Sequence, residues 1–177
     1  RTRCDAKIDL TTYKTGSLYV AKTSNSTDDI VLVHSSDIHV DDGYTARAND
    51  GDGTNPLLDV LRTAEFVKAD IVLLVGDVFE HNRLANDIVS KAARIMGGAP
   101  MHVVALPGNH DPAIPDSPWH HKEMGKADKL HILGVTHKRA VQFPDFDLEI
   151  WGQAHRDYGD MNPLARPRKR KTRWQVA

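Results

Sequence analysis

The chain has 177 residues, of which 40% are apolar, 27% charged and 6% aromatic, and its formal net charge is −1. This length is typical of one globular domain that buries a substantial core. The single cysteine, Cys4, excludes an internal disulfide and a cysteine-based zinc cluster. No apolar run is long enough for a membrane-spanning helix, and the first residues lack the apolar stretch of a signal peptide. We therefore expect a cytoplasmic protein without a membrane partner.

The near-zero net charge hides an asymmetry between the body of the chain and its last residues. Residues 161–177 carry six basic residues and no acidic one, which leaves residues 1–160 with 17 basic and 24 acidic residues and a net charge of −7. A basic cluster can bind phosphate backbones, but a short basic run is more often a solvated segment, and we favour the solvated interpretation.

The predicted elements begin after a polar stretch, residues 1–28, which has no clear periodicity and is expected to be an extension. Residues 30–33 form a short β-branched run that is typical of a strand buried on both faces. Residues 41–55 are a Gly-, Asp- and Asn-rich loop, long enough to be either functional or mobile. A helix follows over 56–69, with Pro56 at its first turn, and 71–75 is a second apolar strand.

The alternation then repeats. A second helix is predicted over 83–96 and ends at two glycines, and a third strand over 101–106. Strands that alternate with helices predict βαβ units, so the fold class is α/β with mostly parallel central strands. Further predicted elements are a short helix near 120–128, strands at 130–133, 139–143 and 147–151, and the start of a strand at 174–177.

These elements divide the chain into three parts. They are the extension 1–28, a domain over 29–160, and a basic tail over 161–177 that leads into a truncated strand. We expect the domain to be incomplete.

Chemistry-bearing side chains follow each of the three best strands. Asp37 and His39 follow the first, Asp77 the second, and Asn109 and His110 the third. Ligand sites in open α/β sheets lie at the carboxyl ends of the strands, so these side chains are expected to converge. Carboxylate, imidazole and amide ligands suit manganese, iron, zinc or magnesium. Residues 37–39 and 76–77 alone are ordinary turn chemistry, whereas residues 108–111 are less ordinary, with a plain Asn turn as the alternative. The occurrence of all three motifs in order at successive strand ends favours a metal site.

At these residues the sequence resembles the calcineurin-like metallophosphoesterase family. The family pattern D-x-H, GD and GNH[DE] stands here as residues 37–39, 76–77 and 108–111, and the resemblance covers about 30–155. It implies two divalent metal ions, with manganese favoured. One ion is held by Asp37 and His39, the second by Asn109, and Asp77 bridges both.

The resemblance also implies the reaction. Two ions activate a water to hydroxide and clamp the phosphate, which makes the chain a hydrolase of phosphate esters. His110 is expected to protonate the leaving oxygen or to stabilise the developing charge, and Asp111 to fix the His110 ring. Residues 76–80 (GDVFE), with 34–37 and 147–152, are similar to the DNA-repair exonucleases of the family. The expected substrate is therefore a phosphodiester, with nucleic acid as the leading option.

The chain departs from the family pattern in one respect. Two later histidine segments that complete both metal shells are absent, and no histidine follows His155. His155 could replace a missing ligand, although an ordinary loop histidine is the favoured interpretation. The alternative hypothesis is a non-catalytic binding or scaffold module with an incomplete metal site. A third is that these residues are the front part of a longer enzyme.

Overall fold

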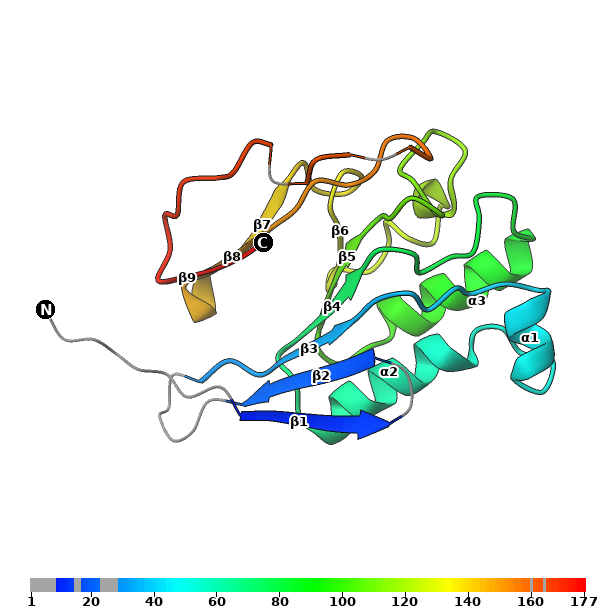
Figure 1. The fold of residues 1–177 in the computed structure, drawn as a ribbon, viewed down its shortest axis with the longest axis horizontal. Coiled ribbons are helices and arrows are strands. Elements are labelled where there is room, and N and C mark those ends of the chain that lie inside the picture. The colour runs from blue at the N-terminus through cyan, green and yellow to red at the C-terminus, as the bar shows by residue number, and fades with distance from the viewer. Residues whose placement is uncertain (1–8, 15–16, 23–28, 160, 164) are drawn as a thin grey trace, which may run out of the picture.

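The computed structural model describes residues 9–14, 17–22, 29–159, 161–163 and 165–177 (Figure 1). The helices are α1 (Tyr44–Ala48), α2 (Asn55–Phe66) and α3 (Asn86–Gly97), with short 3₁₀ turns η1 (Pro118–His120) and η2 (Pro144–Phe146). The strands are β1 (Asp9–Lys14), β2 (Ser17–Lys22), β3 (Leu32–Ser35), β4 (Ile71–Val75), β5 (His102–Leu106), β6 (Leu130–Ile132), β7 (Ala140–Phe143), β8 (Leu148–Trp151) and β9 (Trp174–Val176).

The main sheet contains the first six strands in the order β1-β2-β3-β4-β5-β6. Strands β3 to β6 are parallel, and β1 and β2 extend the sheet antiparallel at the β3 side. Helices α2 and α3 connect β3 to β4 and β4 to β5, as parallel neighbours require. The predicted α/β fold with a parallel centre is confirmed.

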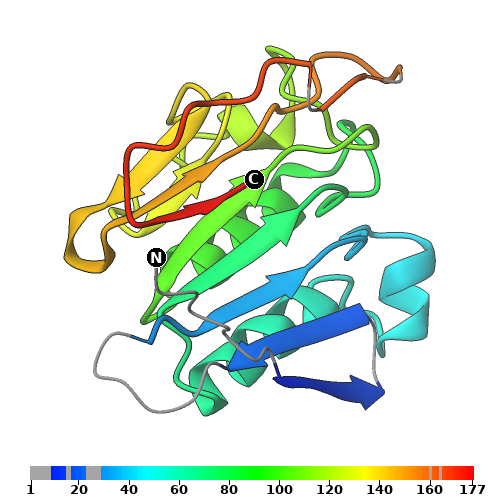
Figure 2. The same cartoon turned by 60° about the vertical axis from the view of Figure 1, so that its left-hand side comes forward.

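Strand β4 explains why the sheet has a layer on each side. Its residues are apolar without alternation, and its side chains pack into two different cores. Val72 and Leu74 pack with the residues of α2 and α3, whereas Ile71 and Leu73 pack with those of β7 and β8. Figures 1 and 2 show the resulting three layers, with the helices on one face of the main sheet and β7, β8 and β9 on the other.

The second sheet has the order β7-β8-β9, with β7 antiparallel and β9 parallel to β8. Strand β9, which pairs with β8, comes from the basic tail, so the strand predicted at the end of the chain is confirmed. The tail also contributes Arg168, whose Nη2 lies 2.8 Å from Oε2 of the fully buried Glu149. Most basic residues of the tail are exposed, as a solvated segment requires, but Arg168 and β9 attach the tail to the second sheet.

Three local predictions differ from the structure. Residues 9–22, where no element was predicted, contain the antiparallel pair β1 and β2. The loop 41–55 contains helix α1, which the buried Asp41 stabilises by accepting hydrogen bonds from the backbone of Gly43 and Thr45. No α-helix forms over 120–128, because Gly125 lies in its middle and Met124 is its only buried side chain.

Within the described residues, no helix is long and apolar enough to cross a membrane.

Candidate metal centre

The loops that follow β3, β4 and β5 are joined by backbone hydrogen bonds at the carboxyl edge of the sheet. Asp37 N donates to Gly76 O over 3.3 Å, and His39 N donates to Asp77 O over 3.0 Å. Gly76 N donates to Leu106 O over 2.8 Å and so joins the loop after β4 to strand β5. The convergence predicted from parallel strand ends is thus present in the backbone.

Three of the predicted ligands have left-handed backbone. The φ angles are 55° at Asp37, 52° at His39 and 52° at Asp77. This region is uncommon for residues other than glycine, and such strain accumulates at functional sites when the surroundings enforce it. The backbone hydrogen bonds between the loops supply that enforcement.

A first group of possible metal ligands consists of Asp37, His39 and Asp77. One ligand atom from each residue lies within 4.8 Å of those of the other two. The Asp37 carboxylate is largely exposed, whereas His39 and Asp77 are half-buried. Asp77 Oδ1 also accepts a hydrogen bond of 3.0 Å from His110 N, which fixes the carboxylate between the second and third loops.

A second group consists of His39, Glu80 and His110, and it shares His39 with the first. His39 Nδ1 lies 2.7 Å from Glu80 Oε2 but lacks hydrogen-bond alignment with it. This buried nitrogen therefore has no hydrogen-bond partner in the described part of the chain. The His39 and His110 rings lie 4.9 Å apart at 83°. An unpartnered imidazole nitrogen beside a carboxylate fits a divalent cation in its donor chemistry.

Asn109 lies between Gly108 and His110 in the third loop and is exposed. Gly108 allows this loop to approach the second one. A Cβ built at Gly108 would lie 2.9 Å from Gly76 Cα and would collide with Asp77. Only glycine therefore permits the spacing that brings Asn109 to the edge where Asp77 lies.

Asp111 differs from its expected role. It is fully buried, its Oδ1 accepts from Gly108 N at 2.7 Å, and its Oδ2 accepts from Phe79 N at 2.9 Å. Burial raises the pKa of Asp111 to about 7, although these backbone donors oppose the rise. Asp111 was expected to fix the His110 ring, but the group beside that ring is Glu80, whose carbonyl lies 3.1 Å from His110 Nδ1. Asp111 instead joins the second and third loops.

His155 lies at the edge of this region. Its backbone N donates to Pro107 O over 3.2 Å, and its carbonyl accepts from Ala113 N over 2.8 Å. Its Nδ1 is buried without a hydrogen-bond partner in the described part of the chain. His155 belongs to neither of these two groups of His, Asp and Glu side chains.

Glu80 is the residue at this centre to which the sequence analysis gave no role. It lies three residues after Asp77, and both residues between them are buried. The bridge between Val40 and Phe79 and the bond from Glu80 N to Val40 O carry Glu80 alongside the first loop. The sequence carries no clear signal for this position, because Glu80 is brought there by a single bridge at Phe79 between two bends.

Comparisons with protein families, curated sequences and solved structures show what the chain is similar to. The family model described as calcineurin-like phosphoesterase matches residues 30–174. No curated protein sequence matches the chain. Among solved structures, the chain is similar to the nuclease MPE of Pseudomonas putida, with 12% identity and a TM-score of 0.38, over 83% of this chain and 66% of that one. Because the family model covers most of its length, the chain belongs to the calcineurin-like phosphoesterase family.

Proposed function

We propose that the chain hydrolyses phosphodiesters in a reaction that depends on divalent metal ions. The observation that carries this proposal is the convergence of Asp37, His39 and Asp77, each on left-handed backbone, with ligand atoms within 4.8 Å of one another. Left-handed backbone also occurs outside the site, at Asp50, Lys68 and Asp147, so the support for the proposal comes from the convergence of the three ligand atoms. The family to which the chain belongs supports the same reaction class.

The proposed ligands divide between two ions. Asp37 and His39 would hold the first, Asn109 the second, and Asp77 would bridge them. Divalent ions held there supply activation of a water and neutralisation of charge on the phosphate oxygens. Manganese is the metal that the resemblance to the family favours, and the donor set of carboxylate, imidazole and amide groups suits iron, zinc or magnesium as well.

His110 is the proposed proton donor to the leaving oxygen. Its Nδ1 lies 3.1 Å from the Glu80 carbonyl, and a carbonyl only accepts, so Nδ1 carries a hydrogen. Nε2 is then the nitrogen that exchanges a proton with the substrate. Asp111 acts as a positioning residue, because it fixes the Gly108 backbone that precedes Asn109 and His110.

Nucleic acid is the proposed substrate class. The similarity of residues 76–80 to the DNA-repair exonucleases of the family supports it. A nucleic-acid diester also suits a chain whose basic residues gather in its last segment, because phosphate backbones bind to such clusters.

The test compares Asp77→Asn with Asp42→Asn, a substitution at an exposed position of the neighbouring loop. Hydrolysis of bis-(p-nitrophenyl) phosphate should require added manganese. It should fall in Asp77→Asn by more than the roughly 10- to 100-fold that loss of an outer partner costs at metal sites. Asp42→Asn should keep the wild-type rate, and p-nitrophenyl phosphate measures any preference for diesters.

The competing hypothesis is a binding module with an incomplete metal site. Within the proposed ligand set, the second ion has only Asp77 and Asn109, and two protein ligands seldom hold a metal well. Calorimetric titration with manganese separates the two hypotheses. Absence of saturable binding, together with equal and metal-independent hydrolysis by wild type and Asp77→Asn, would contradict catalysis and favour the module.

A further inference from the structure

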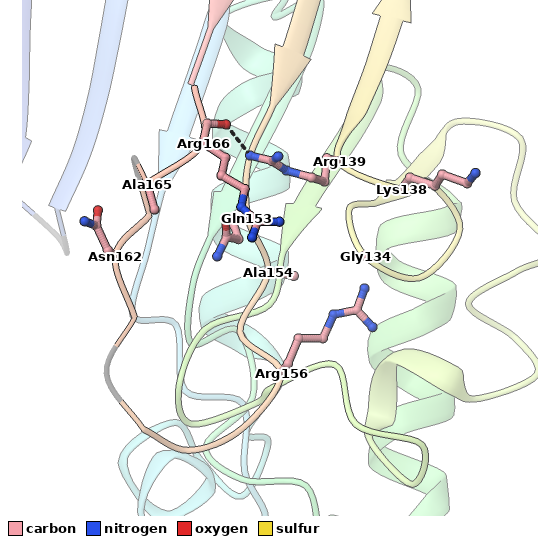
Figure 3. A pocket seen from close by; sticks show the side chains of 9 residues that line it. All are labelled: Gly134, Lys138, Arg139, Gln153, Ala154, Arg156, Asn162, Ala165 and Arg166. Atoms are coloured by element: carbon pink, nitrogen blue, oxygen red, sulfur yellow. Dashed lines mark hydrogen bonds between the residues drawn. The ribbon is translucent and has the colours of Figure 1, made fainter. Parts of the chain in front are cut away.

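A basic hollow lies on the side of the second sheet, and its lining residue Gly134 lies near Ala113, which follows the loop that carries Asn109 and His110. Its volume is about 500 Å³, which is within the range of small-molecule and cofactor sites. Figure 3 shows the residues around it, which are Gly134, Lys138, Arg139, Gln153, Ala154, Arg156, Asn162, Ala165 and Arg166. Four of these nine are basic and none is acidic. The hollow therefore attracts anions.

Arg139 is the most fixed of the four basic side chains. Its Nη2 donates to the carbonyl of Arg166 over 2.7 Å, as Figure 3 shows, and its guanidinium lies 5.6 Å from the Trp151 ring centre. Its Nε is buried and has no acceptor in the described part of the chain. Arg139 therefore contributes a positive charge that is fixed in place, and a planar guanidinium suits phosphate.

Arg156 connects the hollow to the candidate metal centre. Its Nη2 would lie 3.7 Å from a Cβ built at Gly134, so its guanidinium points across the hollow. The preceding residue, His155, is hydrogen-bonded through its backbone to both Pro107 and Ala113. These two residues flank the segment that contains Asn109 and His110. The backbone that leads into the hollow is therefore joined to both ends of the loop that carries Asn109 and His110.

An exposed aromatic ring follows on the same segment. Tyr158 is 59% exposed, and its hydroxyl accepts a hydrogen bond of 3.2 Å from Asn82 Nδ2. That bond joins the segment after β8, which carries Tyr158, to the loop after β4, which carries Asn82. Exposed aromatic rings beside basic grooves stack the unpaired bases of single strands.

We propose that the hollow binds backbone phosphates of a single-stranded nucleic acid next to the bond that is cleaved. The inference rests on the proposed phosphodiesterase function. Arg139, Arg156 and Arg166 bind the phosphates, and Tyr158 stacks an adjoining base. A single strand suits the observations better than a duplex does, because bases within a duplex do not present their faces to an aromatic ring.

The test measures the anisotropy of a fluorescein-labelled oligothymidylate with the whole chain, in EDTA so that no hydrolysis occurs. The test variant is Arg156→Gln with Arg166→Gln, because both side chains are exposed. The control is Arg62→Gln with Arg94→Gln, which changes the charge equally on the helical face. We expect affinity to fall about tenfold in the test variant only, and the salt slope to weaken by about 1.4 for two lost phosphate contacts.

Hydrolysis of bis-(p-nitrophenyl) phosphate separates this proposal from the proposed function. The test variant should keep its wild-type rate, because so small a diester does not extend into the hollow. If no variant hydrolyses the diester but the anisotropy differences remain, only the proposed function fails. Equal losses of affinity in the test and control variants would contradict the proposal that the hollow binds a single strand. Full competition by inorganic phosphate at the same concentration as the oligonucleotide would contradict it as well.

Discussion

Three ligand-type residues with left-handed backbone distinguish the candidate metal centre from ordinary strand ends. The sequence predicts that Asp37, His39 and Asp77 converge, because parallel strand ends meet at one edge of a sheet. It does not predict their backbone strain, because that strain comes from hydrogen bonds between loops distant in sequence. The position of Glu80 escapes prediction for the same reason: it depends on the pairing of Val40 with Phe79.

Gly108 gives the sharpest structural prediction at this scale. A Cβ there would collide with the Asp77 backbone and lie 2.9 Å from Gly76 Cα, and backbone atoms cannot rotate away. We expect Gly108→Ala to lower the free energy of unfolding by about 1–3 kcal/mol, as overpacking does, and to weaken manganese binding because Asp77 shifts. Urea unfolding and calorimetric titration measure the two effects.

Gly125→Ala is the matched control, because a Cβ at that exposed turn meets nothing within 4 Å. It should leave both quantities unchanged. Equal stability and equal manganese binding in Gly108→Ala and Gly125→Ala would contradict the role assigned to the close approach of the two loops.

At the scale of elements, burial on both faces made the central strands predictable. The unbroken apolar run at 71–75 and the run at 101–106, which is apolar except for His102, correspond to β4 and β5. Each strand packs against helices on one face and a sheet on the other. The helix predicted near 120–128 failed because its residues lack a continuous apolar face. Most of the stability of a helix in a protein comes from the packing of such a face.

A histidine cluster between β5 and β6 makes stability depend on pH. His131 Nε2 lies 3.1 Å from His102 Nδ1, and the His131 ring centre lies 5.0 Å from that of His137. Burial, with the charges of His137 and His102, lowers the pKa of His131 to about 4. The unfolded chain therefore binds more protons than the folded chain between pH 6.5 and pH 4, so stability falls as the pH falls through that range.

Replacement of His131 by glutamine should reduce this dependence. We expect the melting temperature of His131→Gln to fall less than that of the wild type between pH 6.5 and pH 4, because one buried proton acceptor is gone. His120→Gln, at an exposed position of η1, should follow the wild-type profile. Parallel profiles for wild type and His131→Gln would show that this histidine does not cause the acid sensitivity.

For the whole molecule, the basic tail changes its meaning between sequence and structure. Its six positive charges predict a solvated segment, and Lys169, Arg170 and Lys171 are indeed exposed. Arg168, however, pairs with Glu149, and β9 completes the second sheet beside β8. The sequence could not show this pairing, because a glutamate in a predicted strand is normally expected on its solvent face.

The ion pair between Arg168 and Glu149 should therefore hold the tail on the second sheet. Hydrogen bonds from Arg168 and Gln175 lower the pKa of the buried Glu149, so its carboxylate stays charged. In Arg168→Met the Glu149 carboxylate loses its charged partner but keeps the hydrogen bond from Gln175. Because the Arg168 side chain is 35% exposed, we expect a loss of about 1–3 kcal/mol of unfolding free energy. Adding Glu149→Gln should recover part of the loss, because it removes the unpaired charge. Arg170→Met, at an exposed position, is the control. Urea unfolding measures the stability of both arginine variants, and equal stability would contradict the pairing of Arg168 with Glu149.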